Sequence, residues 1–282
     1  MKYSDNVVTH HKINDFEYLT FKALEKYEDK LVHFITLRHG GVSKGYYDSL
    51  NLRAVSKDGI KNVNKNFEIV CDNMDIDKNK VYKAKQDHTD NILILNSDNK
   101  EKYNFYNLSK DAYDAYIINE KEIANFITTA DCNPIIVYDK KKNIVLNVHA
   151  GWKGVASQIY LKGIKMLVND FYSNVKDLIV CIGPSIRKCC FSSEDENFKR
   201  IFTDKWKDEE KYIYYEDDNK RFHIDLIYLI KNDLIALGID ESNINIADIC
   251  TCDNYNDFYS YRKSTINKDS DYATFSTWVK LK

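Results

Sequence analysis

The sequence predicts an α/β fold, a single domain in which mixed β-sheets are flanked by helices. Two observations carry this prediction: apolar runs of strand length recur along the whole chain, and only a few segments have helical spacing. The strand-like runs are rich in β-branched and aromatic residues, which favours strands over helices. They cover residues 31–37, 91–96, 126–130, 134–138, 143–150, 178–183 and 243–249.

One pair of these runs predicts a β-hairpin. Residues 134–150 read PIIVYDKKKNIVLNVHA, two apolar runs joined by the charged segment DKKKN. A short polar segment between two strand-like runs is typical of a solvated hairpin turn. Since a hairpin joins antiparallel strands, we expect a mixed sheet rather than a doubly wound parallel one.

Three segments predict helices. Residues 155–171 follow a glycine-rich turn, and residues 224–239 have apolar residues at helical intervals. The second of these ends near Gly238, where a glycine suits the end of a helix. A third helix is expected over residues 61–74.

Nothing in the sequence divides the chain into two domains. Its 282 residues are 44% hydrophobic and 30% charged, which is ordinary for a globular protein with a sizeable core. The sequence contains no internal repeat, no low-complexity tract and no linker rich in proline, glycine or serine. We therefore expect one catalytic domain over residues 1–282, with residues 1–30 as its N-terminal segment.

Charge and hydropathy exclude several classes of function. Lys and Arg total 41 against 43 for Asp and Glu, so the formal net charge is -2. A dedicated binder of nucleic acid or of anionic membranes would show clustered basic excess. No apolar run approaches the roughly 20 residues that span a bilayer, and residues 1–15 lack the apolar core of a signal peptide. We expect a cytoplasmic protein without nucleic-acid or membrane partners, and either a monomer or a homodimer.

Three chemically active side chains lie at predicted strand ends. His88 closes AKQDHTDN, Cys132 lies in TTADCNP, and His149 closes NIVLNVHAGWKG. Side chains at strand ends are well placed to line a cleft. A cysteine with a histidine could form a nucleophilic dyad. Alternatively, a cysteine with two histidines suits a catalytic zinc that keeps one open position. A purely structural role, in which each of the three is a packed core residue, stays open at this point.

Two glycine-containing loops are candidate anion sites. HAGWKG places Gly151 and Gly154 around Trp152 just before a predicted helix, and backbone N–H groups at a helix start bind anions. LRHGGVSKG contains Arg38, which could hold a phosphate or a carboxylate. An ordinary strand-to-helix turn, with Trp152 as a core aromatic residue, explains the first loop equally well.

Three further residues are candidates around these loops. Arg262 in SYRK is expected at a late strand end, either in the site or as a solvated surface arginine. Gln86 precedes His88 by two residues and would share its face of a strand, as a substrate contact or a support for the ligand. Asp131 neighbours Cys132 and could move protons, but adjacent strand residues face opposite ways, so a structural hydrogen-bonding role is at least as well supported.

The seven cysteines have irregular spacing, which is typical of reduced thiols. Four of them occur as CC and CTC, at positions 189, 190, 250 and 252. Neither is the usual C-x2-C spacing of a zinc site. We therefore expect these four to be partly buried, reduced thiols rather than a second metal site.

The motifs, taken together, resemble those of the YlmD/YfiH family. This family is known as the laccase-domain or polyphenol oxidase family, and its members as multifunctional purine nucleoside phosphorylases. TLRHGGVSKGYYDSLNL, QDHTDN, TTADCNPIIVYD, NVHAGWKG, CIGPSIRKCC and FYSYRK occur in the family's order. The resemblance runs from about residue 31 to the C-terminus, and the TADC-P and HAGW-G motifs together are highly specific.

The resemblance implies a single zinc held by His88, Cys132 and His149, in a fold similar to that of the cytotoxic necrotizing factor deamidases. It implies that purine nucleosides and phosphate are the substrates: phosphorolysis of adenosine, inosine, guanosine and S-methyl-5'-thioadenosine to the free base and (methylthio)ribose 1-phosphate. Adenosine deamination is implied as a side activity. Cys132, His149 and Asp131 would be catalytic.

Three segments depart from the family's pattern. They are residues 111–119, which read DAYDAYIIN, residues 191–196, which read FSSEDE, and residues 264–280, which lack the usual threonine-glycine-arginine. The three metal ligands are intact. We expect the altered segments to frame the pocket, so the departures bear on substrate contacts rather than on metal binding.

Three other functions remain as alternatives. A metal-independent hydrolase or deamidase would use Cys132 and His149 as a dyad. A non-catalytic partner protein would have lost turnover through the altered segments. Copper-dependent polyphenol oxidation is disfavoured, because the chain has no His-x-His motif, although Cu2+ could occupy the zinc site.

Overall fold

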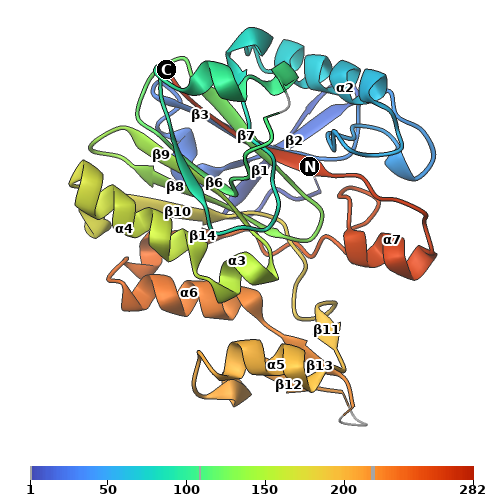
Figure 1. Ribbon diagram of the computed structural model, residues 1–282, viewed down its shortest axis with the longest axis vertical. Helices are drawn as coiled ribbons and strands as arrows, with labels where there is room; N and C mark the ends of the chain where they lie inside the picture. The colour runs from blue at the N-terminus through green and yellow to red at the C-terminus, as the bar shows by residue number, and fades with distance from the viewer. Residues whose placement is uncertain (1, 108, 217–219) are drawn as a thin grey trace.

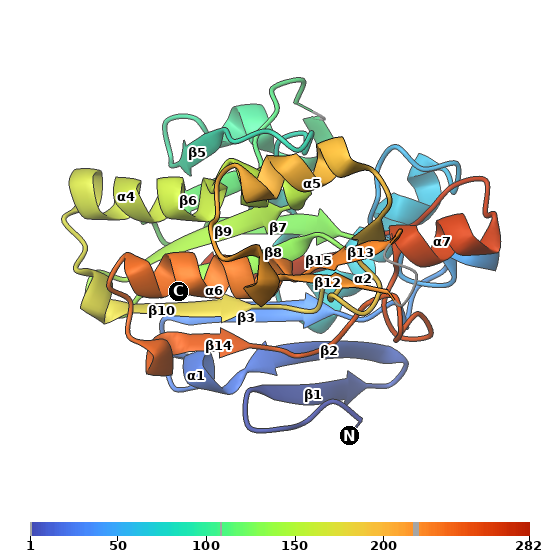
Figure 2. The same ribbon diagram turned by 90° about the horizontal axis from the view of Figure 1, so that it is seen from below.

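Two six-stranded β-sheets lie face to face in the computed structural model, which describes residues 2–107, 109–216 and 220–282 (Figures 1 and 2). The first sheet has the order β1-β2-β3-β15-β7-β4. Its strands are Val8–Ile13 (β1), Phe16–Phe21 (β2), Leu31–Thr36 (β3), Phe275–Leu281 (β15), Ala124–Thr129 (β7) and Val81–Tyr82 (β4).

The second sheet has the order β14-β10-β8-β9-β6-β5. Its strands are Ile244–Ile246 (β14), Leu178–Ile182 (β10), Asn133–Asp139 (β8), Ile144–Ala150 (β9), Ala115–Ile118 (β6) and Ile92–Leu95 (β5). Both sheets contain parallel and antiparallel pairs, so the predicted mixed sheet is confirmed. The predicted hairpin is β8–β9, whose register pairs Asn133 with Ala150.

Helices cover the outer face of each sheet. The helices are Lys22–Glu25 (α1), Ile60–Asn73 (α2), Trp152–Ala156 (α3), Ile159–Phe171 (α4), Glu196–Thr203 (α5), Leu226–Ala236 (α6) and Tyr261–Asn267 (α7). Of these, α2 packs on the outer face of the first sheet, and α3, α4 and α6 pack on that of the second. A three-stranded sheet of Ser192–Ser193 (β11), Phe222–Ile224 (β13) and Ile213–Tyr215 (β12) lies with α5 at one end of the molecule (Figure 1).

The alternation of side chains along the strands builds three cores. On β8, Ile136 and Tyr138 belong to the core between the sheets, whereas Ile135 and Val137 pack with the helices α4 and α6. A third core, with Phe67 of α2 at its centre, covers the outer face of the first sheet. Strands buried on both faces read as continuous apolar runs, which is why β8 was recognisable in the sequence.

The predicted helix over 155–171 is wrong in one respect, because the structure divides it into α3 and α4. Gln158 between them has a positive φ of 56°, which an α-helix does not allow. Its side chain donates to Asp233 of α6 at 2.8 Å, so tertiary contact holds the break. The other two predicted helices are α2 and α6, and Gly238 has the positive φ expected beyond the end of α6.

The strand ends place several loops at one edge of the two sheets. The pairings Asn133 with Ala150, Ile135 with Ile182 and Ala115 with Val148 bring the starts of β8 and β6 beside the ends of β9 and β10. The end of β7 reaches the same edge, because its chain continues through 130–132 directly into β8. Loops far apart in the sequence therefore meet there.

Among the described residues, no helix is long and apolar enough to cross a membrane.

The packing of α4 on β9 generates the first prediction. A Cβ atom at Gly163 would lie 2.7 Å from Cδ2 of Leu146. We expect Gly163→Ala to lower the free energy of unfolding by about 1–3 kcal/mol in urea denaturation, because overpacking outweighs alanine's better helix propensity. Lys165→Ala, on the exposed side of α4, should change it by less than about 0.5 kcal/mol. A Gly163→Ala protein as stable as the wild type would contradict this close packing.

Candidate metal centre

His88, Cys132 and His149 come together although they lie far apart in the sequence. One ligand atom from each lies within 4.8 Å of the others. Nε2 of His88 is 3.6 Å from Sγ of Cys132, and the two imidazole rings meet edge to face at 4.9 Å between centroids. Tetrahedral zinc with ordinary Zn–S and Zn–N bonds separates its sulfur and nitrogen ligands by ~3.6 Å. The distance therefore fits a shared metal ion.

The three side chains come from three different segments of the chain, one strand and two loops. His149 is on β9 and buried, and Cys132 is half-buried in the loop between β7 and β8. His88 is exposed and lies in the loop between β4 and β5, with a positive φ of 55°. The expectation that His88 closes a strand is thus wrong: β4 ends at Tyr82, and a loop carries the histidine.

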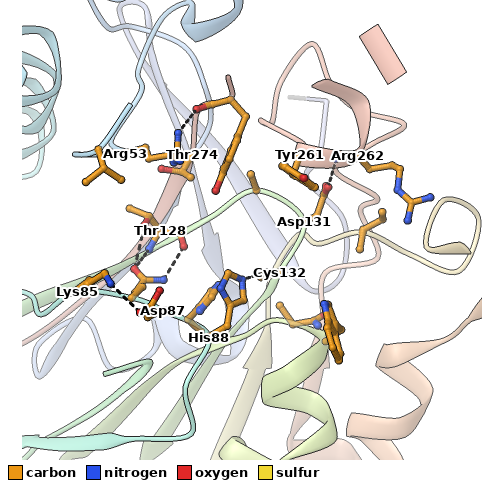
Figure 3. A pocket seen from close by; sticks show the side chains of 18 of the residues that line it. Arg53, Lys85, Asp87, His88, Thr128, Asp131, Cys132, Tyr261, Arg262 and Thr274 are labelled. Atoms are coloured by element: carbon orange, nitrogen blue, oxygen red, sulfur yellow. Dashed lines mark hydrogen bonds and ion pairs between the residues drawn. The ribbon is translucent and has the colours of Figure 1, made fainter. Parts of the chain in front are cut away.

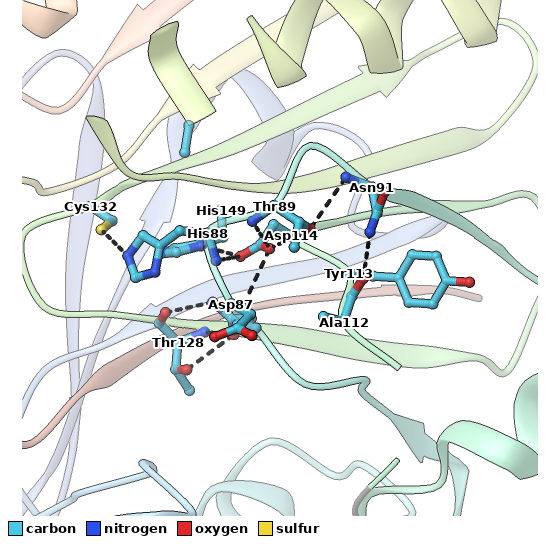
Figure 4. A network of polar contacts seen from close by, with 12 residues as sticks. Asp87, His88, Thr89, Asn91, Ala112, Tyr113, Asp114, Thr128, Cys132 and His149 are labelled. Atoms are coloured by element: carbon cyan, nitrogen blue, oxygen red, sulfur yellow. Dashed lines mark hydrogen bonds and ion pairs between the residues drawn. The ribbon is translucent and has the colours of Figure 1, made fainter. Parts of the chain in front are cut away.

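Asp114 orients both histidines (Figure 4). Nδ1 of His149 is 2.7 Å from its carboxylate, and the backbone N–H of His88 donates to the same oxygen at 3.2 Å. Thr89 donates twice to the other oxygen, through its backbone N–H and its hydroxyl. Burial raises the pKa of Asp114, but the bonds from His149 and Thr89 outweigh it and lower the pKa to about 2. An ionised carboxylate only accepts, so Nδ1 of His149 carries a proton, and Nε2 is the nitrogen that would bind a metal once it has lost its proton.

The charges of Cys132 and His149 stabilise one another. Burial raises the pKa of the Cys132 thiol, but His149 and His88 lower it to about 7. Burial lowers the pKa of His149, but Cys132 and Asp114 raise it to about 9. A thiolate beside an imidazolium is the arrangement of a nucleophilic dyad, and a thiolate is also the form that binds a metal. The pair alone thus fits both chemistries, and the fixed tautomer of His149 together with His88 favours the metal.

A cavity of about 1110 Å³ opens beside this cluster (Figure 3). Its size suits a small-molecule substrate. Aromatic rings and cationic side chains dominate its wall. The rings include Phe105, Trp152, Phe191, Phe198, Tyr261 and Tyr272, and the cations are Arg53, Lys83, Lys85, Lys110 and Arg262.

Seven of the ten residues singled out from the sequence line this cavity. They are Gln86, His88, Asp131, Cys132, His149, Trp152 and Arg262. The amide of Gln86 makes hydrogen bonds to the backbone of Thr128 in both directions, at 2.8 and 2.9 Å. Gln86 therefore ties the loop before His88 to β7.

Arg38 lies elsewhere. Its guanidinium donates to the carbonyl oxygens of Asp48, Tyr255 and Tyr46, and it packs against the rings of Tyr255 and Tyr259. It does not line the cavity. Phosphate binding by Arg38 is therefore not supported, because its donors already hold the backbone of neighbouring loops together.

Arg262 differs from expectation, whereas Asp131 makes the structural hydrogen bonds that were expected as the alternative to proton transfer. Arg262 lies in the first turn of α7 rather than at a strand end, and its guanidinium donates to Ser192. The carboxylate of Asp131 accepts from the Thr251 hydroxyl at 2.6 Å and from the Arg262 backbone N–H at 2.7 Å. These bonds give Asp131 a positioning role, since they join the Cys132 loop to two distant segments.

Gly151 and Gly154 do not line the cavity, and their surroundings differ. A Cβ atom at Gly151 would lie 2.7 Å from Cδ2 of His88 and 3.0 Å from Sγ of Cys132. At Gly154 the nearest atom would be Cγ2 of Ile159, at 3.3 Å. Only Gly151 is thus required to be small by the candidate metal ligands.

Some site residues were missed from the sequence. Asp114 lies in the altered segment 111–119, and its signal was a polar residue directly before an apolar run. Lys83 has no such signal. Its ammonium group donates a hydrogen bond to Gln86 in the cavity wall, and burial lowers the pKa of Lys83 to about 7. Arg53 stacks on Tyr272 at 3.9 Å and is paired with Asp271 at 2.6 Å. Segments 191–196 and 264–280 both contribute cavity-lining residues, as expected, whereas no residue of 111–119 lines the cavity and Asp114 of that segment contacts the candidate metal ligand His149 instead.

Comparison with known proteins identifies the family. The family model described as "Multi-copper polyphenol oxidoreductase laccase" matches residues 32–271, and the chain belongs to this family. The relatives include a purine nucleoside phosphorylase of Bacteroides thetaiotaomicron, 28% identical over 88% of this chain and 92% of that protein. Purine nucleoside phosphorylase YlmD of Bacillus subtilis is 28% identical over 81% of this chain and 82% of its own.

Solved structures confirm the fold and, with these names, the YlmD/YfiH resemblance. YlmD from Geobacillus stearothermophilus superposes with a TM-score of 0.87 at 20% identity, over 99% of this chain and 100% of that one. YfiH from Bacillus licheniformis gives a TM-score of 0.85 at 22% identity, over 97% and 99% of the two chains.

The contact of Asp114 with His149 generates a second prediction. We expect Asp114→Asn to weaken zinc binding about 10–100-fold, because a neutral amide no longer holds the Nδ1 proton as a carboxylate does. Competition with a chromophoric chelator measures the affinity. Asp90→Asn is the matched control, since Asp90 is exposed in the same loop and pairs with Lys162. Equal affinity in Asp114→Asn and wild-type protein would refute the orienting role.

Gly151 generates a third prediction. We expect Gly151→Ala to lose the zinc ion bound by His88, Cys132 and His149 while remaining folded, because the added methyl group pushes His88 away from Cys132. Gly154→Ala, which makes the same change one helical turn away, should keep its zinc. Metal analysis after gel filtration, with circular dichroism as the check of folding, compares the two. Full zinc content in Gly151→Ala would show that the glycine is not needed by the ligands.

Proposed function

We propose that the chain is a zinc-dependent purine nucleoside phosphorylase, with His88, Cys132 and His149 as the metal ligands. The observation that carries the proposal is the convergence of these three donors, with Nε2 of His149 left free by Asp114, at the wall of a substrate-sized cavity. Family membership and the names of the curated relatives support the reaction class.

The donor set suits zinc with an open position. When bound, zinc would supply Lewis acidity toward an oxygen of phosphate or water. The chain's own contribution is orientation: Asp114 holds the His149 tautomer, and Asp131 holds the Cys132 loop. Two imidazoles and a thiolate also suit copper. Multicopper chemistry is still disfavoured, because this is the only histidine-containing group of potential ligands within the described residues.

The cavity wall has the chemistry that a nucleoside and phosphate need. Aromatic faces such as Trp152 and Tyr272 suit stacking of a purine base. Arg53 and Lys83 are the basic groups of the wall that suit phosphate, and a bound phosphate would favour the charged form of Lys83, whose pKa is lowered to about 7 by burial. We propose that these two cations, rather than Arg38, face the phosphate. Trp152 packs edge to face on Phe198 at 5.1 Å, which fixes the orientation of its ring.

The substrates follow from this proposal as adenosine, inosine, guanosine and S-methyl-5'-thioadenosine, each with phosphate. Adenosine deamination is the proposed side activity, and it would use the same cavity with water in place of phosphate. A cytoplasmic monomer or homodimer without nucleic-acid or membrane partners remains the expectation.

An assay with adenosine and phosphate tests the proposal. We expect the zinc-loaded protein to form adenine and ribose 1-phosphate only when phosphate is present. Deamination would instead form inosine with or without phosphate. Chelation should abolish phosphorolysis and added zinc should restore it. Cys132→Ala should lose activity and the zinc ion held with His88 and His149, whereas Cys71→Ala, at a buried thiol of α2, should keep both.

The outcomes separate the alternatives. Activity that survives complete chelation would instead indicate a Cys132–His149 dyad. Absence of any product from zinc-loaded protein, across all four nucleosides, would indicate a non-catalytic protein. Oxidation of a phenol by copper-loaded protein, without phosphorolysis by zinc-loaded protein, would support the oxidase.

A further inference from the structure

A second group of metal-ligating side chains lies outside the candidate active site. Cys189, Cys190, Cys250 and Asp253 each have a ligand atom within 4.8 Å of the others. The thiols of Cys189 and Cys190 donate to different oxygens of Asp253, at 3.0 and 3.1 Å. All three cysteines are free thiols. The sequence spacing predicted no metal site here, and the tertiary structure brings the two segments together.

The backbone fixes the two segments against each other. Ser185 forms a parallel bridge with Cys250, in which the N–H of Ser185 donates to Ile249 at 3.2 Å and that of Thr251 donates to Ser185 at 3.1 Å. The segment 187–190 closes a turn, because the N–H of Cys190 donates to the carbonyl of Arg187 at 2.9 Å. These backbone hydrogen bonds therefore hold the segments of the four donors in place without a bound ion.

The donor chemistry selects the ion. Three thiolates with one carboxylate provide four ligands, the number in a closed tetrahedral zinc site. Tetrahedral zinc separates its sulfur ligands by ~3.8 Å, which is compatible with ligand atoms that all lie within 4.8 Å. Cys250 is buried whereas Cys189 and Asp253 are exposed, so an ion can enter from solvent. Because no ligand position would remain open, the site is structural rather than catalytic.

We propose that Cys189, Cys190, Cys250 and Asp253 bind a second zinc ion, which fastens the wall of the active-site cavity. Both segments reach that wall. Phe191 follows Cys190 and lines the cavity, and the hydroxyl of Thr251 donates to Asp131 beside Cys132. This second site does not depend on the proposed phosphorylase activity, because it shares no ligand with the first.

Zinc stoichiometry tests the proposal on the full chain. Protein loaded with zinc and freed of excess by gel filtration should contain two zinc ions per wild-type chain. Cys132→Ala should contain one, Cys189→Ser should contain one, and the double variant none. Cys252→Ser is the matched control: Cys252 lies in the same turn but outside the group of four, so this variant should keep both ions.

Cobalt provides a readout that does not depend on how the Cys189 variant folds. Cobalt-loaded Cys132→Ala has only the second site, and it should show a thiolate-to-cobalt charge-transfer band from three sulfurs. That band should persist in Cys132→Ala with Cys252→Ser. Two results would overturn the proposal: one zinc or fewer in the wild type with none lost in Cys189→Ser, or a disulfide among these cysteines in protein that has bound no second ion.

Discussion

The carboxylate of Asp114 is the contact on which the candidate active site depends. It is fully buried at the start of β6, and it accepts hydrogen bonds from His149 on β9 and from the loop that carries His88. The Asp114 side chain thus fixes the tautomer of His149 on a rigid strand, and it also holds the backbone of the irregular loop that carries His88. Without an anion at this position, His88 and Thr89 would lose the acceptor that holds their backbone, and Nδ1 of His149 would lose the partner that directs Nε2 toward Cys132.

The two sheets determine why these groups meet. Pairing of β9 with both β8 and β6 brings Cys132, His149 and Asp114 to one edge, because the register sets Asn133 opposite Ala150 and Ala115 opposite Val148. Hydrogen bonds to Asp131 join this edge to two more segments: the Thr251 hydroxyl connects it to the cysteine-rich turn, and the Arg262 backbone N–H connects it to α7. Side chains on rigid strands can be positioned precisely, whereas the loops around them supply the cavity wall and its chemistry.

A glycine and a break between two helices also shape the chain at this edge of the sheets. Gly151 leaves room for His88 and Cys132, and the break at Gln158 turns the chain from α3 into α4. Glycine is a common N-cap residue, so Gly151 agrees with local preference, whereas the left-handed Gln158 interrupts a predicted helix and conflicts with it. Local rules fail where tertiary contacts or a functional site override them.

The sequence by itself determined several strands that are buried on both faces, such as β8 and β10 but not β6 or β15, together with the helices that have a clear apolar face and the three candidate ligands. Each of these has a local signal: an apolar run, a period, or a reactive residue where a run ends. Only the tertiary structure decided that Arg38 holds loops instead of phosphate, that Asp114 orients His149, and that Cys189, Cys190 and Cys250 form one cluster with Asp253. These facts are distances between residues far apart in the chain, such as the 120 positions between Asp131 and Thr251, and no local period records them.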